Sequence, residues 1–449
     1  MRVHENVLSA IGKTPMVKLN RIGADLPVNF FGKFEATNPG GSIKDRIAVA
    51  MIEEAEANGE LKPGGTIIEA TAGNTGVGLA LVAAIKGYKC VFVLPDKMSE
   101  DKVNLLKAFG AEVVVTATDV PPDSPDNYSN VAARLTKETP GAYRPGQFTN
   151  KTNPNTHYSI TAPEIWEDMG GKVDAFVCGV GTGGCISGIG KFLKEKNPEA
   201  KIVLADPEGS ILSGDTSQKP WKVEGIGEDY IPATYDPQIV DDCVRVSDQE
   251  SFNMARRITK EEGMFVGGST GTHMVAALRY AERMPAGSNI VVLFCDTGRN
   301  YLGRIFNDQW MKSQNFLETK EERVNLKQIL PKKHNSTLHS IAKSAKVIEA
   351  IRLMHKYNIS QLPVVDDNKV VGRLNEAVMM KLLHDGLDLE KQEVWAVMGN
   401  PMPVLDEAAS ANEAYRRLSS TDAAVVVTKD GVPAAVLTKI DLIDYWLGT

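Results

Sequence analysis

The stretch Asn38-Pro39-Gly40-Gly41-Ser42-Ile43-Lys44-Asp45-Arg46 places a lysine directly after a turn-forming Pro-Gly-Gly segment. Apolar residues follow at helical spacing, so the pattern predicts a helix from about Ser42 to Ala57 that ends at Gly59. Lys44 then lies in the first turn, close to backbone amides that favour negative charge. Such a lysine suits an amine that condenses with a phosphorylated aldehyde. On these nine residues alone, an ordinary solvated lysine is an equal alternative.

Two glycine-rich loops are found further along the chain. The first, Glu69–Gly76, follows the apolar run Thr66–Ile68 and precedes a helix of small residues. Its Asn74 is either a helix cap or an amide presented to a ligand. The second loop, Gly179–Cys185, joins a strand-like segment, Ala175–Cys178, to a helical one. Backbone amides in a strand–loop–helix turn of this kind form a binding site for anions.

The second loop also fits a different cofactor. Gly179, Gly181 and Gly184 satisfy the G-x-G-x-x-G pattern, and Asp206 ends the next strand about twenty residues later. This arrangement is the dinucleotide-binding fingerprint with its ribose-binding acid. A single match of this kind is nonspecific, and it leaves Lys44 and Asn74 without a role.

Taken in order, these motifs and the later Gly267–Gly271 resemble the β-family of pyridoxal-phosphate enzymes. The resemblance extends from about Val7 to Met311 and favours pyridoxal phosphate over a nicotinamide cofactor. Within that family, Asp206–Leu212 and Val223–Asp229 are more similar to the cystathionine β-synthases than to the cysteine synthases.

Composition limits the classes of function. The chain has 449 residues, a formal charge of -7 and a pI near 5.7, which argue against nucleic-acid or anionic-membrane surfaces. No charged-then-apolar leader opens it, and no apolar run is long enough to span a bilayer. Its five cysteines and seven histidines show no metal-ligand spacing, so we expect no metal site. Free thiols in a reducing cytoplasm are the interpretation that fits the cysteines.

The order of segments predicts the domains. Strand-like and helix-like segments alternate from Val28 to about Leu293, which predicts a doubly wound, mostly parallel α/β fold. The resemblance implies two such subdomains around a cofactor cleft, in a catalytic domain over residues 1–316. Residues 317–333 are charged and irregular, and we interpret them as a linker that has room for one short helix.

Residues 334–449 contain a weak internal repeat. Val347–Arg352 matches Ala411–Arg416, and each copy leads through an apolar strand, Leu362–Val365 or Ala424–Val427, to a second strand and a helix. Each copy leaves an apolar sheet face uncovered, so we expect the two to pack together. The pair resembles the tandem CBS domains that sense adenosine nucleotides.

The resemblance assigns roles to the residues around the cofactor. It implies that Lys44 forms the Schiff base with pyridoxal phosphate and then removes the substrate's α-proton. Asn74 corresponds to the residue that contacts the cofactor's ring oxygen. The phosphate-binding positions are Gly181, Thr182, Gly183, Gly184 and Cys185. Because relatives carry threonine at position 185 and a thiol is the poorer donor, we expect one weaker phosphate contact.

Ser269 corresponds to the residue that faces the pyridine nitrogen. A neutral hydroxyl there leaves that nitrogen largely unprotonated and the ring a milder electron sink, which suits β-elimination over transamination. Asp296 is the nearby acid, with a turn or capping role as the alternative.

The substrate carboxylate positions are Thr71, Ala72, Gly73, Thr75 and Gln147. Ala72 replaces the usual serine. Phe148 stands where cystathionine synthases carry tyrosine, and in this it resembles the cysteine synthases.

The resemblance implies condensation of L-serine with L-homocysteine to L-cystathionine and water, with hydrogen sulfide as a side product from cysteine. It also implies a homodimer or homotetramer. One alternative is a cysteine synthase that uses O-acetylserine and sulfide. Another is a non-catalytic protein that senses an adenosyl ligand through its repeats.

Two further expectations concern ligands. Animal cystathionine synthases carry a haem-binding extension, whereas here the core motif Ile11–Pro15 begins within a dozen residues of Met1, so we expect no haem. In the second repeat Thr438 and Asp441 are spaced as a helix capping box. In tandem CBS domains the matching pair contacts an adenosine ligand, and the first repeat has Asn375 and Val378 instead. We therefore expect one adenosyl site per chain, with S-adenosylmethionine favoured over adenine nucleotides.

Overall fold

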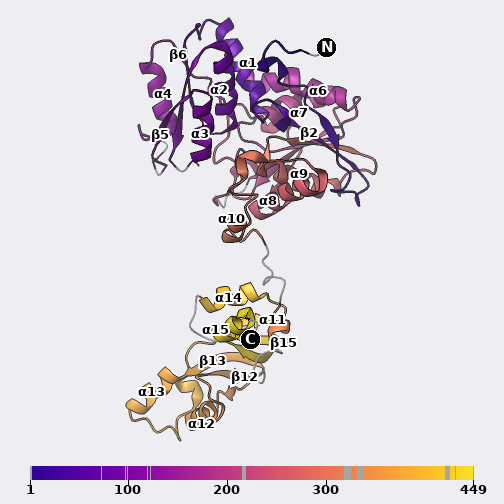
Figure 1. Cartoon of the computed structure of the whole chain (residues 1–449). Helices are drawn as coiled ribbons and strands as arrows, with labels where there is room; N and C mark the ends of the chain where they lie inside the picture. The colour runs from indigo at the N-terminus through magenta and orange to yellow at the C-terminus, as the bar shows by residue number, and fades with distance from the viewer. Residues whose placement is uncertain are drawn as a thin grey trace. The chain divides into compact units, whose positions relative to one another are not determined.

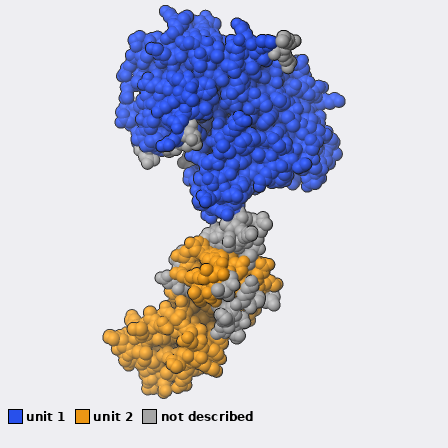
Figure 2. All heavy atoms as spheres, viewed as in Figure 1, with its two compact units in different colours: residues 1–317 blue, residues 318–449 orange. Residues whose placement is uncertain are grey.

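The computed structural model describes residues 3–71, 73–96, 98, 100–118, 120–121, 123–214, 219–317, 325–330, 338–419, 425–429 and 431–447 (Figure 1). The chain divides into two compact units, Met1–Leu317 and Glu318–Thr449 (Figure 2). Each unit is described by itself.

The larger sheet of the first unit has six strands. Its order is β1-β2-β10-β7-β8-β9, with bounds Met16–Lys18, Asn29–Phe34, Asn289–Phe294, Ala175–Cys178, Lys201–Pro207 and Asp242–Val246. All neighbouring pairs are parallel except β1 with β2. Successive residues point to opposite faces, so Val177 packs in one core and Phe176 in the other. Helices therefore cover both faces of this sheet.

The helices of this part follow the alternation that the sequence predicts. α8 (Asp248–Arg257) and α9 (Gly268–Ala281) lie on the face that bears Val177, and α6 (Ala162–Asp168) and α7 (Gly184–Lys196) lie on the other. The short helices α5 (Thr152–Thr156) and α10 (Asp308–Ser313) complete this subdomain.

The smaller sheet has four parallel strands in the order β5-β4-β3-β6. Their bounds are Glu112–Thr116, Lys89–Pro95, Thr66–Ala70 and Ala142–Tyr143. α1 (Lys44–Ala57), α2 (Asn74–Lys86) and α3 (Glu100–Ala108) cover one face, and α4 (Tyr128–Glu138) covers the other. The two sheets confirm the predicted doubly wound, mostly parallel fold.

α1 joins the two subdomains, because it packs against α2 of the smaller one and α5 of the larger one. It begins at Lys44, two residues after the predicted start, and ends at Ala57. Gly59 follows with a φ of +75°, a conformation that favours glycine and stops the helix.

The second unit contains two copies of one α/β motif. The first has β11 (Ile341–Ala342), α12 (Val347–Tyr357), β12 (Gln361–Asp366), β13 (Lys369–Asn375) and α13 (Glu376–His384). The second has β14 (Val404–Asp406), α14 (Ala411–Ser419), β15 (Val425–Lys429), β16 (Val432–Leu437) and α15 (Lys439–Leu447). β13 and β16 contact each other, and Met402 packs against Val370 and Val436. The two predicted repeats therefore pack together; Ala424, the predicted start of β15, lies outside the described residues.

The predicted linker contains one structured element within the described part of the chain. α11 (Leu326–Ile329) buries Leu326 and Ile329 in the core of the second repeat, beside Leu405 and Leu418. The limits of the linker stay a prediction. All five cysteines are free. Across the described ranges, no helix has the length and apolar character needed to cross a bilayer.

Candidate active site

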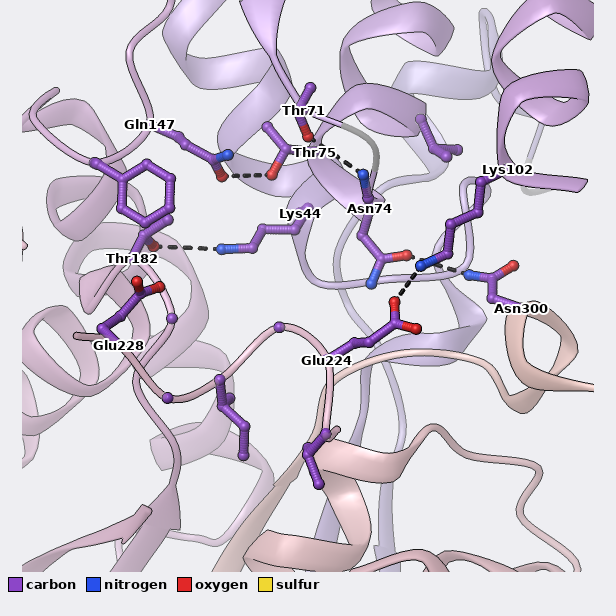
Figure 3. Close-up of a pocket in the computed structure, with 18 of the residues that line it drawn as sticks. Lys44, Thr71, Asn74, Thr75, Lys102, Gln147, Thr182, Glu224, Glu228 and Asn300 are labelled. Carbon is purple, nitrogen blue, oxygen red and sulfur yellow. Dashed lines mark hydrogen bonds and ion pairs between the residues drawn. The ribbon is translucent and has the colours of Figure 1, made fainter. Parts of the chain in front are cut away.

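A cavity of about 280 Å³ lies where the loops that follow β3 and β7 meet the start of α1 (Figure 3). In open α/β sheets, ligands bind in the crevice beyond the carboxyl ends of parallel strands. The predicted site residues that line this cavity are Lys44, Thr71, Gly73, Asn74, Thr75, Gln147, Gly181 and Thr182. Gly183, Gly184, Cys185 and Ser269 lie outside the lining, and Ala72 lies outside the described residues.

Lys44 extends across the cavity toward the second glycine-rich loop. Its Nζ donates a hydrogen bond to Oγ1 of Thr182 at 3.3 Å. The Nδ2 of Asn153 donates to the same oxygen at 2.9 Å, so Thr182 is held from two sides. The lysine is partly buried and directed into the cavity, which contradicts the alternative of a solvated lysine.

A buried network fixes the motif that carries Lys44. Arg46 contacts Glu35 at 2.8 Å and Glu164 at 2.7 Å, and its side chain is 2% exposed. Asn38 donates to Glu35 and to the carbonyl of Ser42, while its Oδ1 accepts from the backbone of Gly12. Gly12 and Glu164 lie far from the motif in the sequence, which is why the motif alone did not reveal these contacts.

Asp45 closes the Pro-Gly-Gly turn from within the helix. Its Oδ2 accepts the amide of Gly40 at 2.5 Å, and its buried Oδ1 has no partner in the described part of the chain. Burial raises the pKa of this carboxyl to about 7, which outweighs the hydrogen bond from Gly40 and the charge of Arg46. The carboxyl beside Lys44 therefore holds its proton more tightly than an ordinary aspartate does.

Asn74 is presented to the cavity as a fixed amide. It is the first residue of α2, whose N-cap position is Gly73, so the capping interpretation is wrong. Its Nδ2 donates to Oδ2 of Asp296 at 2.8 Å, and its Oδ1 accepts from Asn300 at 3.2 Å. The hydroxyl of Tyr301 donates to the same oxygen of Asp296 at 2.7 Å. Burial raises the pKa of Asp296 to about 6.

The second glycine-rich loop fits a phosphate group. Within the described part of the chain, the amides of Gly181 to Cys185 donate to no protein acceptor, and α7 begins at Gly184. A Cβ on Gly184 would lie 1.9 Å from Oδ1 of Asn153, and one on Gly181 would lie 2.3 Å from the carbonyl of Gly225. Only glycine permits so close a loop, which leaves its amides available to an anion.

Two further predicted cofactor positions, Cys185 and Ser269, do not line the cavity. Cys185 is partly buried, and its Sγ lies 3.4 Å from Nε2 of His157. Burial raises the pKa of this thiol to about 11, so it stays protonated at neutral pH. Ser269 is buried as the second residue of α9. Asp206, the acid of the dinucleotide alternative, accepts the amide of Ser213 at 2.9 Å and does not line the cavity.

The predicted substrate positions lie along one side of the cavity. Oγ1 of Thr75 donates to Oε1 of Gln147 at 2.6 Å, so the two side chains fix each other (Figure 3). Phe148 also lines the cavity and packs against Tyr230, with ring centroids 6.0 Å apart.

Three charged residues that line the cavity could not be assigned a role from the sequence: Lys102, Glu224 and Glu228. Lys102 of α3 contacts Glu224 (Figure 3). Arg304, which does not line the cavity, also contacts Glu224, at 2.5 Å. The segment Val223–Asp229 indicated the family. The direction of its side chains into the cavity, however, depends on the positive φ of Gly225 and Gly227.

In the second unit, Thr438 and Asp441 are bonded to each other. Oδ2 of Asp441 accepts from the amide of Thr438 at 2.7 Å and from its hydroxyl at 2.6 Å. This is the predicted capping arrangement at the start of α15. In the first repeat Asn375 caps α13 by accepting the amide of Val378 at 3.0 Å.

Comparisons with known proteins agree with this architecture. The family model "Pyridoxal-phosphate dependent enzyme" matches residues 7–296, and the CBS domain model matches residues 332–385 and 394–448. A cystathionine beta-synthase of Dictyostelium discoideum is 38% identical over 464 residues, which cover 99% of this chain and 92% of that protein. A cysteine synthase of Staphylococcus aureus is 43% identical over 66% of this chain and 95% of its own length.

A solved structure agrees with the first unit. It is that of a hydrogen sulfide-producing enzyme from Fusobacterium nucleatum, which is 42% identical with a TM-score of 0.64. The match covers 67% of this chain and 100% of that one.

Proposed function

Because the chain belongs to the pyridoxal-phosphate dependent enzymes and, within them, to the cystathionine β-synthase family, we propose that it condenses L-serine with L-homocysteine to L-cystathionine and water. The observation that carries this proposal is the similarity to a cystathionine beta-synthase along 99% of the chain, the second unit included. The chain is a pyridoxal-phosphate dependent enzyme, so the non-catalytic alternative is set aside.

The residues of the cavity suit this cofactor. We assign Lys44 to its aldehyde, Asn74 to its ring oxygen, Ser269 to its ring nitrogen and the amides of Gly181 to Cys185 to its phosphate. Both the unpaired amides and the glycine loop that a Cβ would obstruct support the phosphate assignment. When bound, pyridoxal phosphate withdraws electrons from an attached amino acid, which makes the α-proton removable and the β-substituent a leaving group.

The chain's own groups then bind the substrate and move protons. Thr71, Thr75 and Gln147 hold the substrate carboxylate by hydrogen bonds. The amine of Lys44 takes the proton from Cα and returns it after the β-substituent has been exchanged. A base positioned in this way contributes about 10² to 10⁴ in rate.

A substrate comparison tests the proposal. Serine with homocysteine should give cystathionine faster than O-acetylserine with sulfide gives cysteine. Lys44→Ala should lose turnover with both pairs and should also lose the cofactor that borohydride traps on the wild-type chain. A wild-type protein that folds without binding pyridoxal phosphate would overturn the cofactor assignment.

Cysteine synthase is the second candidate. Phe148 lines the cavity where cystathionine synthases carry tyrosine, and the S. aureus cysteine synthase is 43% identical. Preference for O-acetylserine and sulfide in the comparison above would favour it. Release of hydrogen sulfide from cysteine with homocysteine is the expected side reaction.

We also propose a regulatory ligand for the second unit. The match to two CBS domains supports a module that binds an adenosyl compound, and we assign the site to Thr438 and Asp441 with S-adenosylmethionine as ligand. A carboxylate that only accepts hydrogen bonds suits a ribose diol. We further propose a homodimer or homotetramer in the cytoplasm, where a reducing environment accounts for five free cysteines.

A further inference from the structure

Glu228 is a carboxylate at the reacting end of the cavity, and none of the roles above uses it. It lines the same cavity as Lys44 and Thr182, and Figure 3 shows its side chain near the Thr182 end, away from Lys102. Within the described part of the chain, the carboxylate of Glu228 makes no hydrogen bond and no ion pair, and only its backbone is hydrogen-bonded.

The neighbouring carboxylate, Glu224, is in the opposite situation. Lys102 and Arg304 both neutralise it, and it lies where these side chains converge. Two glutamates four residues apart on one loop thus have different environments: one is an ion-pair partner, and the other has no partner among the described residues.

The backbone around Glu228 is fixed. Its amide donates to Oγ of Ser210 at 3.1 Å, and its carbonyl accepts from the amide of Ile211 at 3.0 Å. One residue earlier, Gly227 donates to the carbonyl of Val180 at 2.8 Å. This last bond ties the Glu228 loop to the glycine-rich loop that we assign to the phosphate, so the backbone of Glu228 has a set position relative to that loop.

We propose that Glu228 transfers a proton in both halves of the reaction. It protonates the leaving group of the first substrate and then accepts the proton from the thiol of the second substrate. In the first half of the reaction, the Cβ–Oγ bond of serine breaks while the carboxylic acid of Glu228 protonates the departing oxygen, which leaves as water. In the second half, the Glu228 carboxylate accepts the thiol proton as sulfur bonds to Cβ. Lys44 removes the Cα proton in the first half and returns it in the second, so protons and electrons balance. This assignment rests on the proposed β-replacement.

The surroundings of Glu228 suit a group that changes protonation in each cycle. Burial and the neighbouring Asp229 raise its pKa to about 8, and the charge of Lys44 lowers it by less. Tyr128 at the start of α4 and Tyr230 on the same loop also face it, and both have raised pKa values, so they are neutral at pH 7. An acid with a pKa near the working pH is the most effective proton carrier.

The test separates the two halves of the reaction with the full-length holoenzyme. Single-turnover absorbance changes of the cofactor follow the first half without thiol, using serine and O-acetylserine in turn. Glu228→Gln should slow the serine reaction by about 10²-fold or more, because hydroxide is a poor leaving group. It should leave the O-acetylserine reaction unchanged, because acetate departs without a proton. Homocysteine added after O-acetylserine should react slowly in the variant at pH 7 and recover as rising pH ionises the thiol.

Glu199→Gln is the matched control. It makes the same substitution at an exposed glutamate that does not line the cavity, and it should leave the ratio of serine to O-acetylserine rates as in the wild type. The infrared difference spectrum of wild type minus Glu228→Gln should contain a protonated-carboxyl band at pH 7 that disappears by pH 9.

The outcomes distinguish this inference from the proposed substrate pair. Equal slowing of both first substrates by Glu228→Gln, or no slowing of either, overturns the proton-carrier role. A wild-type enzyme that does not react with serine overturns the substrate proposal instead. In that case the homocysteine half-reaction after O-acetylserine decides the role of Glu228, and a variant that matches the wild type at pH 7 refutes it.

Discussion

Lys44, which we propose as the Schiff-base lysine, depends on residues that do not line the cavity. Arg46 occupies the same helical turn as Lys44 and is held by Glu35 and Glu164 in the interior. Burying such charges is costly, but removing one partner is costlier, because the other charge is then left without compensation. The network thus fixes the turn from which Lys44 reaches Thr182.

Arg46→Ala should lower the free energy of unfolding by about 3–5 kcal/mol, because it leaves Glu35 buried and unpaired. Denaturant titration measures this loss. Arg279→Ala is the matched control: it removes an arginine whose ion pair with Glu250 is exposed, and it should cost about 0–1 kcal/mol. Similar losses in the two variants would contradict the importance assigned to the buried network.

Asp45 should make stability depend on pH. Its pKa is raised from 3.8 to about 7 in the folded chain, so the folded state binds this proton more tightly than the unfolded state does. The stability that protonation contributes is complete below about pH 4 and is lost as pH rises through 7. Asp45→Asn should therefore become more stable relative to the wild type between pH 5 and pH 8.

Thermal unfolding at the two pH values checks the Asp45 prediction. Glu199→Gln, at an exposed position, is the control and should show no such trend. A constant difference between Asp45→Asn and the wild type across this range would show that the carboxyl titrates at its ordinary value.

At the scale of elements, the two glycine-rich loops could be predicted because their requirement is local. A loop that presents several amides to an anion needs glycine at each close approach, and this leaves a pattern in the sequence. The helix that begins at Gly184 and the strand that ends at Cys178 flank the loop as predicted. The hydrogen bond between Asn74 and Asp296 could not be predicted, because it joins residues 222 positions apart.

Gly184→Ala should weaken pyridoxal phosphate binding by about tenfold or more. Its Cβ would lie 1.9 Å from Oδ1 of Asn153, so the start of α7 must shift, and one well-aligned charged hydrogen bond is worth about 1.5–3 kcal/mol. Absorbance titration of the apoprotein with cofactor measures the affinity. Gly303→Ala, where a Cβ meets nothing within 4 Å, should bind as the wild type does.

At the scale of the whole molecule, alternation of strands and helices predicted the α/β fold, and the internal repeat predicted the two copies in the second unit. A pattern repeated over many residues predicts the fold class correctly even where one strand pair, β1 with β2, is antiparallel. The cavity's charged residues were not found in this way, since a single Lys102 or Glu228 follows no period. α11 was anticipated only as a short helix within the linker, yet its Leu326 and Ile329 belong to the core of the second repeat.

The regulatory proposal belongs to this scale, because a ligand of the second unit changes activity only by binding two states of the enzyme unequally. Calorimetric titration with S-adenosylmethionine, and with AMP and ATP for comparison, should show one site per chain in the wild type and none in Asp441→Ala. Asn375→Ala is the matched control: it removes the equivalent helix cap from the first repeat, at a similar cost of about 1 kcal/mol, and should bind normally. Binding by Asp441→Ala equal to the wild type, or none by the wild type, would refute the site.

The contact of Lys102 and Arg304 with Glu224 has a consequence for how fast substrates arrive. Lys102 is on α3 of the smaller subdomain, whereas Glu224 and Arg304 belong to the larger one, so these ion pairs join the two subdomains beside the cavity. The side chains of Lys102, Glu224 and Arg304 are 17%, 27% and 43% exposed, which leaves them open to competition from dissolved ions. Raising the ionic strength should weaken these ion pairs and speed the entry of substrate, without changing the groups that react. The rate of entry would then vary with the salt around the enzyme, while the chemistry inside stayed constant.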